Sequence, residues 1–314
     1  MSPIGIRSFW KNECGIRNAE FGILADPVRR GLHPFRIPHS AFRTRMITSK
    51  SNPKVKEIRL LKQAKHRHVR GEYFIEGVRL VEEALRQALP VRKVVYSPRL
   101  EEVERGAALL SSARKKISQA EWLYVNEEVM ESISDTQSHQ GILAVLGKRE
   151  YSWEEFGKRE GVVLLLCELQ DPGNLGTIFR VAEAGGSASL ILSRGSIDPY
   201  SPKVVRASMG SIFRLPFLAN QDPHDCLKVL RSKGYKIWAT AGHGGTSFWE
   251  ADLARTSAVI FGQEGAGIPE DLMKAADGLL TIPMTPPTES LNVAMAAGLV
   301  VYERLRQRKV RSKI

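Results

Sequence analysis

The sequence predicts an α/β protein in which a small α/β domain precedes a larger one built on a parallel sheet. Its 314 residues are enough for about two domains, because one domain usually takes roughly 100–200 residues. From residue 53 onward, segments patterned as strands alternate with segments patterned as helices, which is typical of a sheet with helices on both faces. Several strand segments, such as residues 161–167, are apolar throughout, as buried parallel strands are.

The composition excludes several classes of protein. Apolar residues make up 43% of the chain and charged residues 25%, ordinary values for a globular protein that exclude collagen, coiled coil and wholesale disorder. No apolar run approaches the roughly 18 residues of a membrane span, and no secretory signal pattern is present. Three scattered cysteines without Cys-x-x-Cys spacing (Cys14, Cys167 and Cys226) predict no disulfide framework and no metal site. We therefore expect a cytoplasmic protein in a reducing compartment, without membrane or metal.

Residues 1–45 differ from the rest of the chain. Proline, glycine, arginine and isolated aromatic residues are mixed here without a period of 2 or 3.6, so no face can be buried and we expect poor order. Three interpretations remain open: a basic arm, an arginine-rich transit peptide, or an upstream extension of the reading frame with Met46 as the natural start. We favour the extension, because patterned sequence begins just after Met46.

Residues 46–147 form the predicted small domain. It begins with a basic helix at 53–65, followed by a strand at 72–76 and a helix at 78–88 whose apolar residues recur at helical spacing. The other elements expected here are a strand at 91–96, a helix at 100–111, a strand at 122–125, a short helix capped by Asn126, and a strand at 142–146. The polar residues 148–160 serve as the linker to the next domain.

Residues 161–314 form the predicted parallel-sheet domain. Strands are expected at 162–167, 188–192, 235–240, 257–261 and 279–282. Helices are expected at 174–185, 201–209, 223–233, 268–276 and 288–308. In open parallel sheets, ligands bind beyond the carboxyl ends of the strands, so the loop after each strand is a candidate site.

The formal charge of +12 is concentrated before residue 150 and in the last residues of the chain. The densest patch lies at 54–70 and suits a polyphosphate partner, because each neutralised phosphate releases condensed counterions. A solvated helix face is the alternative. The residues that we expect to bind such a polyphosphate partner are Lys54, Lys56, Arg59, Lys62, Lys65 and Arg67. A second run of cations without an intervening acid ends the chain: Arg304, Arg306, Arg308, Lys309, Arg311 and Lys313.

The first candidate loop follows the strand at 162–167. Its Asp-Pro-Gly-Asn sequence favours a turn, with a helix starting near Asn174. Asn174 and Arg180 lie six residues apart, which is a rotation of about 600° on a helix, so they do not share a face. If Asn174 lies on the turn before the helix, both side chains can still reach one ligand. The alternative is an N-cap asparagine and a surface arginine.

Two further loops have unusual compositions. Residues 261–269 hold three glycines, which let backbone approach a ligand closely, with Glu264 among them. Their order is neither the dinucleotide-binding fingerprint nor a P-loop. Residues 282–292 open a helix rich in small residues, and Ser290 and Asn292 near its start have helix capping as the simplest explanation.

Taken together, these loops resemble the signature motifs of the SpoU (TrmH-type) RNA 2′-O-methyltransferases of the SPOUT superfamily. The segments that carry the resemblance are DPGNLGTIFRVAEAGG (171–186), FGQEGAGIPE (261–270) and IPMTPPTESLNVAMAAGLVVYE (282–303). Three motifs in this order over about 140 residues are far more specific than any one of them. Residues 46–147 resemble the ribosomal-protein-like substrate-binding domain that many members carry.

The resemblance implies a fold and an activity. The fold is a parallel sheet whose C-terminal chain threads a deep trefoil knot, an exception to the rule that proteins avoid knots. The implied cofactor is S-adenosylmethionine, the implied partner a structured RNA, and the implied assembly a homodimer with its site near the subunit interface. The expected reaction moves a methyl group to a ribose 2′-hydroxyl, most often in ribosomal RNA of the 23S type. The alternatives are a transfer-RNA ribose methyltransferase, a base methyltransferase with a related knot, and a non-catalytic knotted RNA-binding protein.

The resemblance also assigns residues. The catalytic candidates are Asn174, Arg180, Glu264, Ser290 and Asn292, and the cofactor-binding candidates are Thr240, Gly262, Gly267, Ile282, Met284 and Leu291. Met295 is a departure, because a smaller residue is expected there. A guanidinium is a poor base, since its pKa lies above about 12. We therefore expect Arg180 to stabilise the developing alkoxide and grip a neighbouring phosphate, with Asn174 orienting Arg180 or the ribose. Glu264 and Asn292 are expected to hold the loops or the cofactor.

Overall fold

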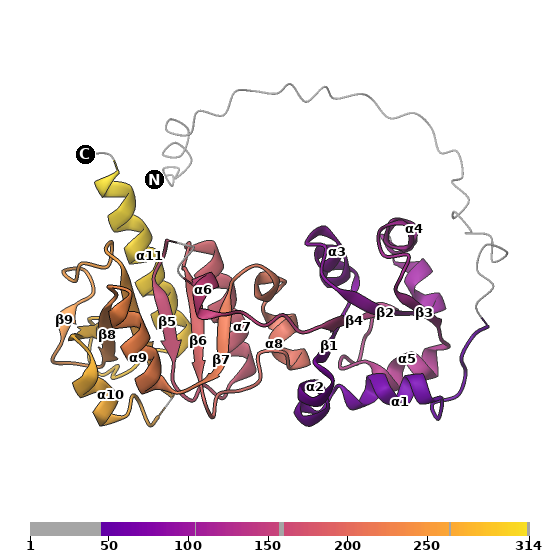
Figure 1. The fold of residues 1–314 in the computed structure, drawn as a ribbon, viewed down its shortest axis with the longest axis horizontal. Helices are drawn as coiled ribbons and strands as arrows, with labels where there is room; N and C mark the ends of the chain where they lie inside the picture. The colour runs from indigo at the N-terminus through magenta and orange to yellow at the C-terminus, as the bar shows by residue number, and fades with distance from the viewer. Residues whose placement is uncertain (1–44, 104, 157–159, 264, 313–314) are drawn as a thin grey trace, which may run out of the picture. The chain divides into compact units, whose positions relative to one another are not determined.

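The fold is described from a computed structural model that covers residues 45–103, 105–156, 160–263 and 265–312 (Figure 1). The predictions for residues 1–44 and for Glu264 lie outside these described residues. Two sheets are present, one before and one after residue 150, as the alternating pattern predicts.

The first sheet has four strands in the order β1-β4-β2-β3. β4 (Ile142–Gly147) pairs antiparallel with both β1 (Glu72–Glu76) and β2 (Val91–Tyr96), and β3 (Glu121–Tyr124) pairs parallel with β2. The helices of this part are α1 (Pro53–Leu60), α2 (Ala64–Arg70), α3 (Val78–Arg86), the 3-10 helix η2 (Pro98–Glu102), α4 (Gly106–Lys116) and α5 (Glu127–Ile133). Asn126 caps α5 as predicted, since its side chain accepts a hydrogen bond from the Val129 amide at 3.1 Å.

Two helix predictions in this part are wrong in the same way, because two separate helices are found where one was predicted. The helix expected at 53–65 is interrupted where Leu61 turns into the core and is only 1% exposed. The Arg67 guanidinium fixes this turn by donating to the Leu61 and Lys62 carbonyls, both at 2.8 Å. The helix expected at 100–111 divides into η2 and α4 at Gly106, where a Cβ would lie 1.8 Å from the Leu100 carbonyl oxygen.

The second sheet has seven strands, all parallel, in the order β7-β6-β5-β10-β8-β11-β9. The strands are β5 (Val163–Leu166), β6 (Ser189–Ser193), β7 (Phe217–Gln221), β8 (Lys236–Ala241), β9 (Thr246–Ser247), β10 (Ser257–Phe261) and β11 (Gly278–Thr281). The edge strands β7 and β9 were not predicted, because β7 has only a short apolar start and β9 has two residues. β10 inserts between β5 and β8, so the carboxyl ends of β8, β10 and β11 lie side by side.

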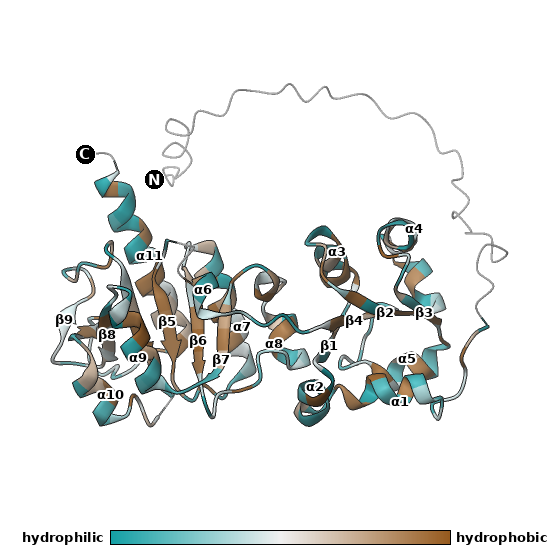
Figure 2. Ribbon diagram, in the orientation of Figure 1, coloured by the Kyte–Doolittle hydropathy of each residue, from teal (hydrophilic) through white to brown (hydrophobic). Residues whose placement is uncertain are grey.

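Helices cover both faces of this sheet, as a buried parallel sheet requires. They are α6 (Trp153–Phe156), α7 (Pro172–Ala184), α8 (Pro202–Ala207), the 3-10 helix η3 (Ser211–Phe213), α9 (Pro223–Ser232), α10 (Glu270–Ala275) and α11 (Val293–Arg311). Leu164 and Leu166 of β5 join the core with α7, α8 and α11, whereas Val163 and Leu165 join the core with α6, α9 and α10. Figure 2 shows the hydrophobic strands between these layers and the hydrophilic end of α11.

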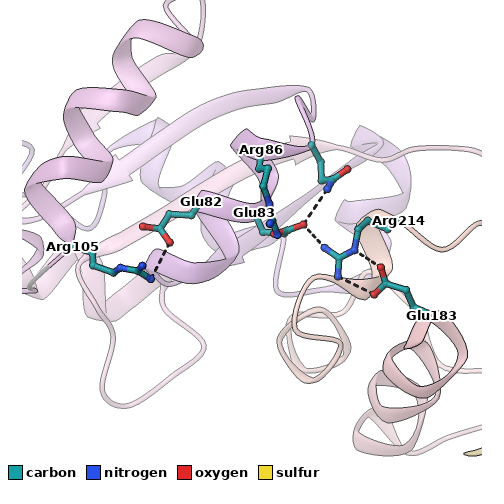
Figure 3. Close-up of polar contacts among 7 residues, drawn as sticks. Glu82, Glu83, Arg86, Arg105, Glu183 and Arg214 are labelled. Carbon is teal, nitrogen blue, oxygen red and sulfur yellow. Dashed lines mark hydrogen bonds and ion pairs between the residues drawn. The ribbon is translucent and has the colours of Figure 1, made fainter. Parts of the chain in front are cut away.

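The segment around α8 and η3 contacts the first sheet through ion pairs. Arg214 donates to Glu183 of α7, with one contact at 2.9 Å, and also reaches Glu83 of α3 (Figure 3). Arg206 pairs with Asp135 at 2.9 Å, and the buried Arg67 pairs with Asp198 at 2.7 Å. Besides the linker predicted at 148–160, these ion pairs therefore connect the residues before it directly with the residues after it.

Candidate active site

A cavity of about 650 Å³ lies at the carboxyl ends of β8, β10 and β11, where the sheet topology predicts a ligand site. The loops after these three strands and the start of α11 form its walls. Every residue expected to bind the cofactor lines it: Thr240, Gly262, Gly267, Ile282, Met284 and Leu291. Ser290 and Asn292 line it as well. Segments more than 50 residues apart in the sequence therefore meet at one place.

The glycine loop after β10 is folded back on itself. Gln263 and Gly267 exchange two backbone hydrogen bonds, at 2.9 and 3.1 Å. A Cβ on Gly262 would lie 2.2 Å from the backbone of Gly267, and Gly267 itself has a φ of 72°. Only glycine permits this close approach. The described glycines of the loop consequently present backbone to the cavity.

The strand ends supply the remaining walls. The Thr240 hydroxyl donates to the Ile260 carbonyl at 3.0 Å and so ties the end of β8 to β10. Phe261, Leu280 and Ile282 add apolar surface. A cavity of this volume with apolar walls and a few convergent polar groups is typical of sites that bind one small molecule.

Asn292 caps α11, as the simplest explanation predicted, and its side chain also makes a second contact. Its side-chain oxygen accepts from the Ala294 and Met295 amides, at 3.0 and 3.3 Å, so α11 begins at Val293 rather than at 288 as predicted. Its side-chain nitrogen donates to the Asn174 side chain at 2.9 Å. The first and third predicted motifs are thus joined by a direct hydrogen bond between side chains 118 residues apart.

The first motif differs from the prediction in where its helix starts. Asp171, not Asn174, is the N-cap of α7, and its side chain accepts from the Asn174 amide at 2.7 Å. Asn174 therefore lies inside the first turn, and Arg180 projects from a different face of the same helix. Arg180 is exposed and does not line the cavity. One copy of the chain brings together Asn174, Ser290 and Asn292 but not Arg180.

The cavity has an unusual charge for so basic a protein. Among its described lining residues, Glu289 is the only charged side chain, and there is no lysine or arginine. The charge of the whole chain is +12. The described walls therefore favour a ligand that carries positive charge. Glu289 was not predicted, although it stands next to Ser290 in the third motif.

The basic patch is partly engaged in structural contacts. Lys54 pairs with Glu121, and Arg59 donates to the Lys50 carbonyl at 2.6 Å. Lys62 donates to the Ser134 carbonyl at 2.6 Å, and burial lowers the pKa of its amine.

Arg67 is only 3% exposed and is held by Asp198. Of the six candidates, Lys56 and Lys65 are exposed and have no ion pair with a described residue. In the described part of the chain, no group of three or more potential ligands could hold a metal ion, and no helix is long and apolar enough to cross a membrane.

Fold and site together define an α/β protein whose parallel sheet carries a cavity of small-ligand size beyond the ends of its central strands. Known proteins place it further. The model of the SpoU rRNA Methylase family matches residues 161–302, and that of the MRM3-like substrate binding domain matches residues 52–144. The chain belongs to the SpoU rRNA methylase family.

Individual relatives agree over most of their length. An uncharacterized tRNA/rRNA methyltransferase of Synechocystis is 36% identical over 83% of this chain and 93% of that protein. The 23S rRNA (guanosine(2553)-2′-O)-methyltransferase RlmP of Bacillus subtilis is 32% identical over 82% of this chain and 98% of its own. The structure of an AdoMet-bound rRNA methyltransferase from Sinorhizobium meliloti has a TM-score of 0.72 at 33% identity, covering 84% of this chain and 98% of that one.

Proposed function

We propose that this protein transfers a methyl group from S-adenosylmethionine to a ribose 2′-hydroxyl of ribosomal RNA. The observation that carries the proposal is the cavity at the ends of β8, β10 and β11, which the second and third family motifs line and to which the Asn174–Asn292 hydrogen bond joins the first. Relatives that match 82% and 76% of this chain are named as 23S rRNA 2′-O-methyltransferases. This reading is favoured over transfer RNA, base methylation and a non-catalytic role.

The residues present fit S-adenosylmethionine. Its net charge is positive, because a sulfonium and an ammonium outweigh one carboxylate, and the described cavity walls hold Glu289 but no cation. Ile282, Met284 and Leu291 offer an apolar surface for the adenine ring of the cofactor, and the glycine loop offers backbone hydrogen-bond donors and acceptors. When bound, this cofactor supplies an electrophilic methyl group.

The chain's own residues have to position the RNA. We assign to the Asn174–Asn292 pair the orientation of the ribose at the cavity, a task in which alignment alone accounts for several kcal/mol. The exposed position of Arg180, away from the cavity, favours a grip on an RNA phosphate over contact with the alkoxide. Ser290 lines the cavity and is exposed, so it is available to the substrate. Glu264 remains a catalytic candidate by its motif.

We propose the homodimer as well. Met295, Leu299 and Tyr302 on α11 are spaced to share one helix face, and Leu291 lies just before the start of that helix. All four side chains are 39–61% exposed. Burying such a stripe against a second copy would remove apolar area from water. Met295, which departs from the family pattern, contributes to this face rather than to the packing within the chain.

The remaining proposals concern domains, knot and compartment. The divisions 1–45, 46–147, 148–160 and 161–314 remain our proposal, with the sheet in each of the two larger ones in support. The position of β10 between β5 and β8, and the packing of α11 on α7, support a knotted C-terminal chain. Buried free thiols at Cys167 and Cys226, whose pKa burial raises to about 12, support a reducing cytoplasmic compartment. For RNA binding we keep Lys54, Lys56, Arg59, Lys62 and Lys65, and omit Arg67 because it is buried.

The test is transfer of labelled methyl from S-adenosylmethionine to RNA, followed by mapping of the modified ribose. We expect 2′-O-methylation of ribosomal RNA and none of transfer RNA. Calorimetric titration with S-adenosylmethionine alone is the companion measurement, since a non-catalytic RNA-binding protein without a working cavity would show no heat of binding. Methylation of a base, or of transfer RNA only, would contradict the proposal.

A further inference from the structure

A second cavity, of about 950 Å³, lies at the opposite edge of the large sheet. Its walls are the residues that lead into the amino ends of three neighbouring strands, together with one side of α11. Glu160 and Gly161 precede β5, residues 233–236 lead into β8, and residues 254–256 lead into β10. The proposed methyl-transfer site, at the carboxyl ends of the strands, uses none of these residues.

The charge of this second cavity is the reverse of the first. Its described lining holds five cationic side chains and a single carboxylate, that of Glu160. The cations are Lys233, Lys236, Arg255, Arg304 and Arg308. Glu160 pairs with Arg308, and Arg255 pairs with Asp252 at 3.0 Å. Lys233, Lys236 and Arg304 have no ion pair with a described residue, although Lys236 lies 4.3 Å from the centre of the Trp238 ring.

Arg304 is the most informative of these residues because it is buried and forms no ion pair with a described residue. Glu160, whose charge acts on it, is already paired with Arg308. Arg304 continues the stripe of α11 that packs into the core, after Ala297, Val300 and Val301, and is only 4% exposed. Its Nε atom is buried and has no hydrogen-bond partner in the described part of the chain. The adjacent carboxylate, Glu303, is already engaged by Arg306 at 2.7 Å. Burial, and then the neighbouring Arg308, lower the pKa of Arg304.

A buried cation without a counter-charge is costly, so a protein rarely keeps one that nothing neutralises. A guanidinium that lines a cavity beside two unpaired lysines is a suitable receptor for a tetrahedral oxyanion, because its planar fork donates two parallel hydrogen bonds. The surplus of cations favours a phosphate, which carries more charge than one carboxylate.

We propose that this second cavity is a phosphate-binding site with Arg304 as its central ligand and Lys233 and Lys236 at its rim. The phosphate has two possible sources, a polynucleotide backbone or a free phosphate compound. The site stands apart from methyl transfer, and its existence does not depend on the proposed function. It also gives a role to Arg304 and Arg308, two members of the cationic run at the end of the chain, which the methyl-transfer site leaves unused.

The first arm of the test measures thermal unfolding of the full chain in inorganic phosphate and in sodium chloride at equal ionic strength. A ligand that binds the folded state raises the melting temperature. We expect a rise of a few degrees in the wild type, none in Arg304→Gln and a smaller one in Lys233→Gln. Arg306→Gln is the matched control, because it removes the same charge two residues farther along α11. The Arg306 side chain is 60% exposed and pairs with Glu303. Arg306→Gln should respond to phosphate as the wild type does.

The second arm measures the affinity of the same variants for a fluorescein-labelled RNA hairpin over a range of salt concentrations. If the source is a polynucleotide, Arg304→Gln weakens binding and lowers the salt slope by about one, whereas Arg306→Gln does not. If RNA binding is unchanged while the response to phosphate is lost, the ligand is a free phosphate compound. A wild type that does not respond to phosphate, or an Arg304→Gln protein that responds fully, would overturn the proposal. Lys233→Gln changes an exposed side chain and should fold normally, so a full response of this variant to phosphate would also count against the proposal if Arg304→Gln did not fold.

Discussion

Asn292 does two things with one side-chain amide, and comparison with a second cap variant can separate their effects. Asn292→Ala removes the cap of α11 and the hydrogen bond to Asn174. We expect a loss of about 1 kcal/mol in unfolding free energy, typical of a lost N-cap. We also expect a roughly 10- to 100-fold lower rate of methyl transfer, because the two motifs lose their alignment. Asn126→Ala is the control: it removes the cap of α5 and should cost similar stability, measured by denaturant unfolding, at normal activity.

Arg180 tests whether binding of cofactor and binding of RNA are separate. The side chain is exposed and does not line the cofactor cavity. Arg180→Ala should therefore bind S-adenosylmethionine like the wild type in calorimetry, yet transfer methyl to RNA roughly 10- to 100-fold more slowly, because the charge-assisted grip on an RNA phosphate is lost. Lys228→Ala, which removes an exposed cation of α9, should leave both unchanged. An equal loss of cofactor affinity in Arg180→Ala would rule out the role assigned to it.

At the scale of elements, the glycine loop after β10 depends on its backbone geometry. Gly262→Ala would place a Cβ 2.2 Å from the backbone of Gly267, which no side-chain movement can relieve. We expect the loop to open and cofactor affinity to fall at least tenfold in calorimetry, about 1.4 kcal/mol. Gly298→Ala, inside α11, meets nothing closer than 3.9 Å and should instead stabilise the fold by up to about 1 kcal/mol. Normal cofactor binding by Gly262→Ala would contradict this account.

The exposed face of α11 predicts how the chain assembles. Leu299→Glu would place a charge in the middle of the stripe formed by Leu291, Met295, Leu299 and Tyr302. If the stripe is buried between two copies, the variant should sediment as a monomer where the wild type sediments as a dimer. Val69→Glu is the control, because Val69 is 76% exposed on α2 and lies outside the stripe. A monomeric wild type would refute the dimer.

Most elements could be predicted from the sequence because their local patterns are strong. The apolar runs at β5 and β10 and the turn at Asp171 each indicate their structure within a few residues. Predictions failed where a distant contact decides. Leu61 ends α1 by turning into the core, Gly106 separates two helices through its closeness to Leu100, and β7 becomes a strand only because β6 is beside it.

At the scale of the whole molecule, the order of the strands is what assembles the site, and no local pattern predicts it. The insertion of β10 between β5 and β8 brings the glycine loop next to Thr240 and Ile282. The motif resemblance identified the residues of the cavity, but not which of them touch. The spacing of Asn174 and Arg180 predicted that they project from different faces of one helix. It could not predict which of the two residues faces Asn292, because that depends on the direction in which α7 leaves β5.

The contacts between the two sheets predict how the RNA-binding and cofactor-binding parts depend on each other. Arg214 holds carboxylates of both parts, Glu83 of α3 and Glu183 of α7, as Figure 3 shows. Arg214→Met would remove the cation that joins these two partly buried carboxylates, although Arg86 would still pair with Glu83. Breaking such a pair costs about 3–5 kcal/mol when it is fully buried and less here.

We expect Arg214→Met to loosen the first sheet relative to the second. RNA affinity and methyl transfer should then fall, while affinity for S-adenosylmethionine, whose cavity lies entirely in the large sheet, stays within twofold of the wild type. Arg214→Lys keeps one charge but cannot bridge both carboxylates with a planar fork. Its RNA affinity and rate of methyl transfer should therefore lie between those of the wild type and Arg214→Met. If Arg214→Met lost cofactor affinity and RNA affinity together, the two parts would unfold as one unit. The assignment of RNA binding to the first part and cofactor binding to the second would then be wrong.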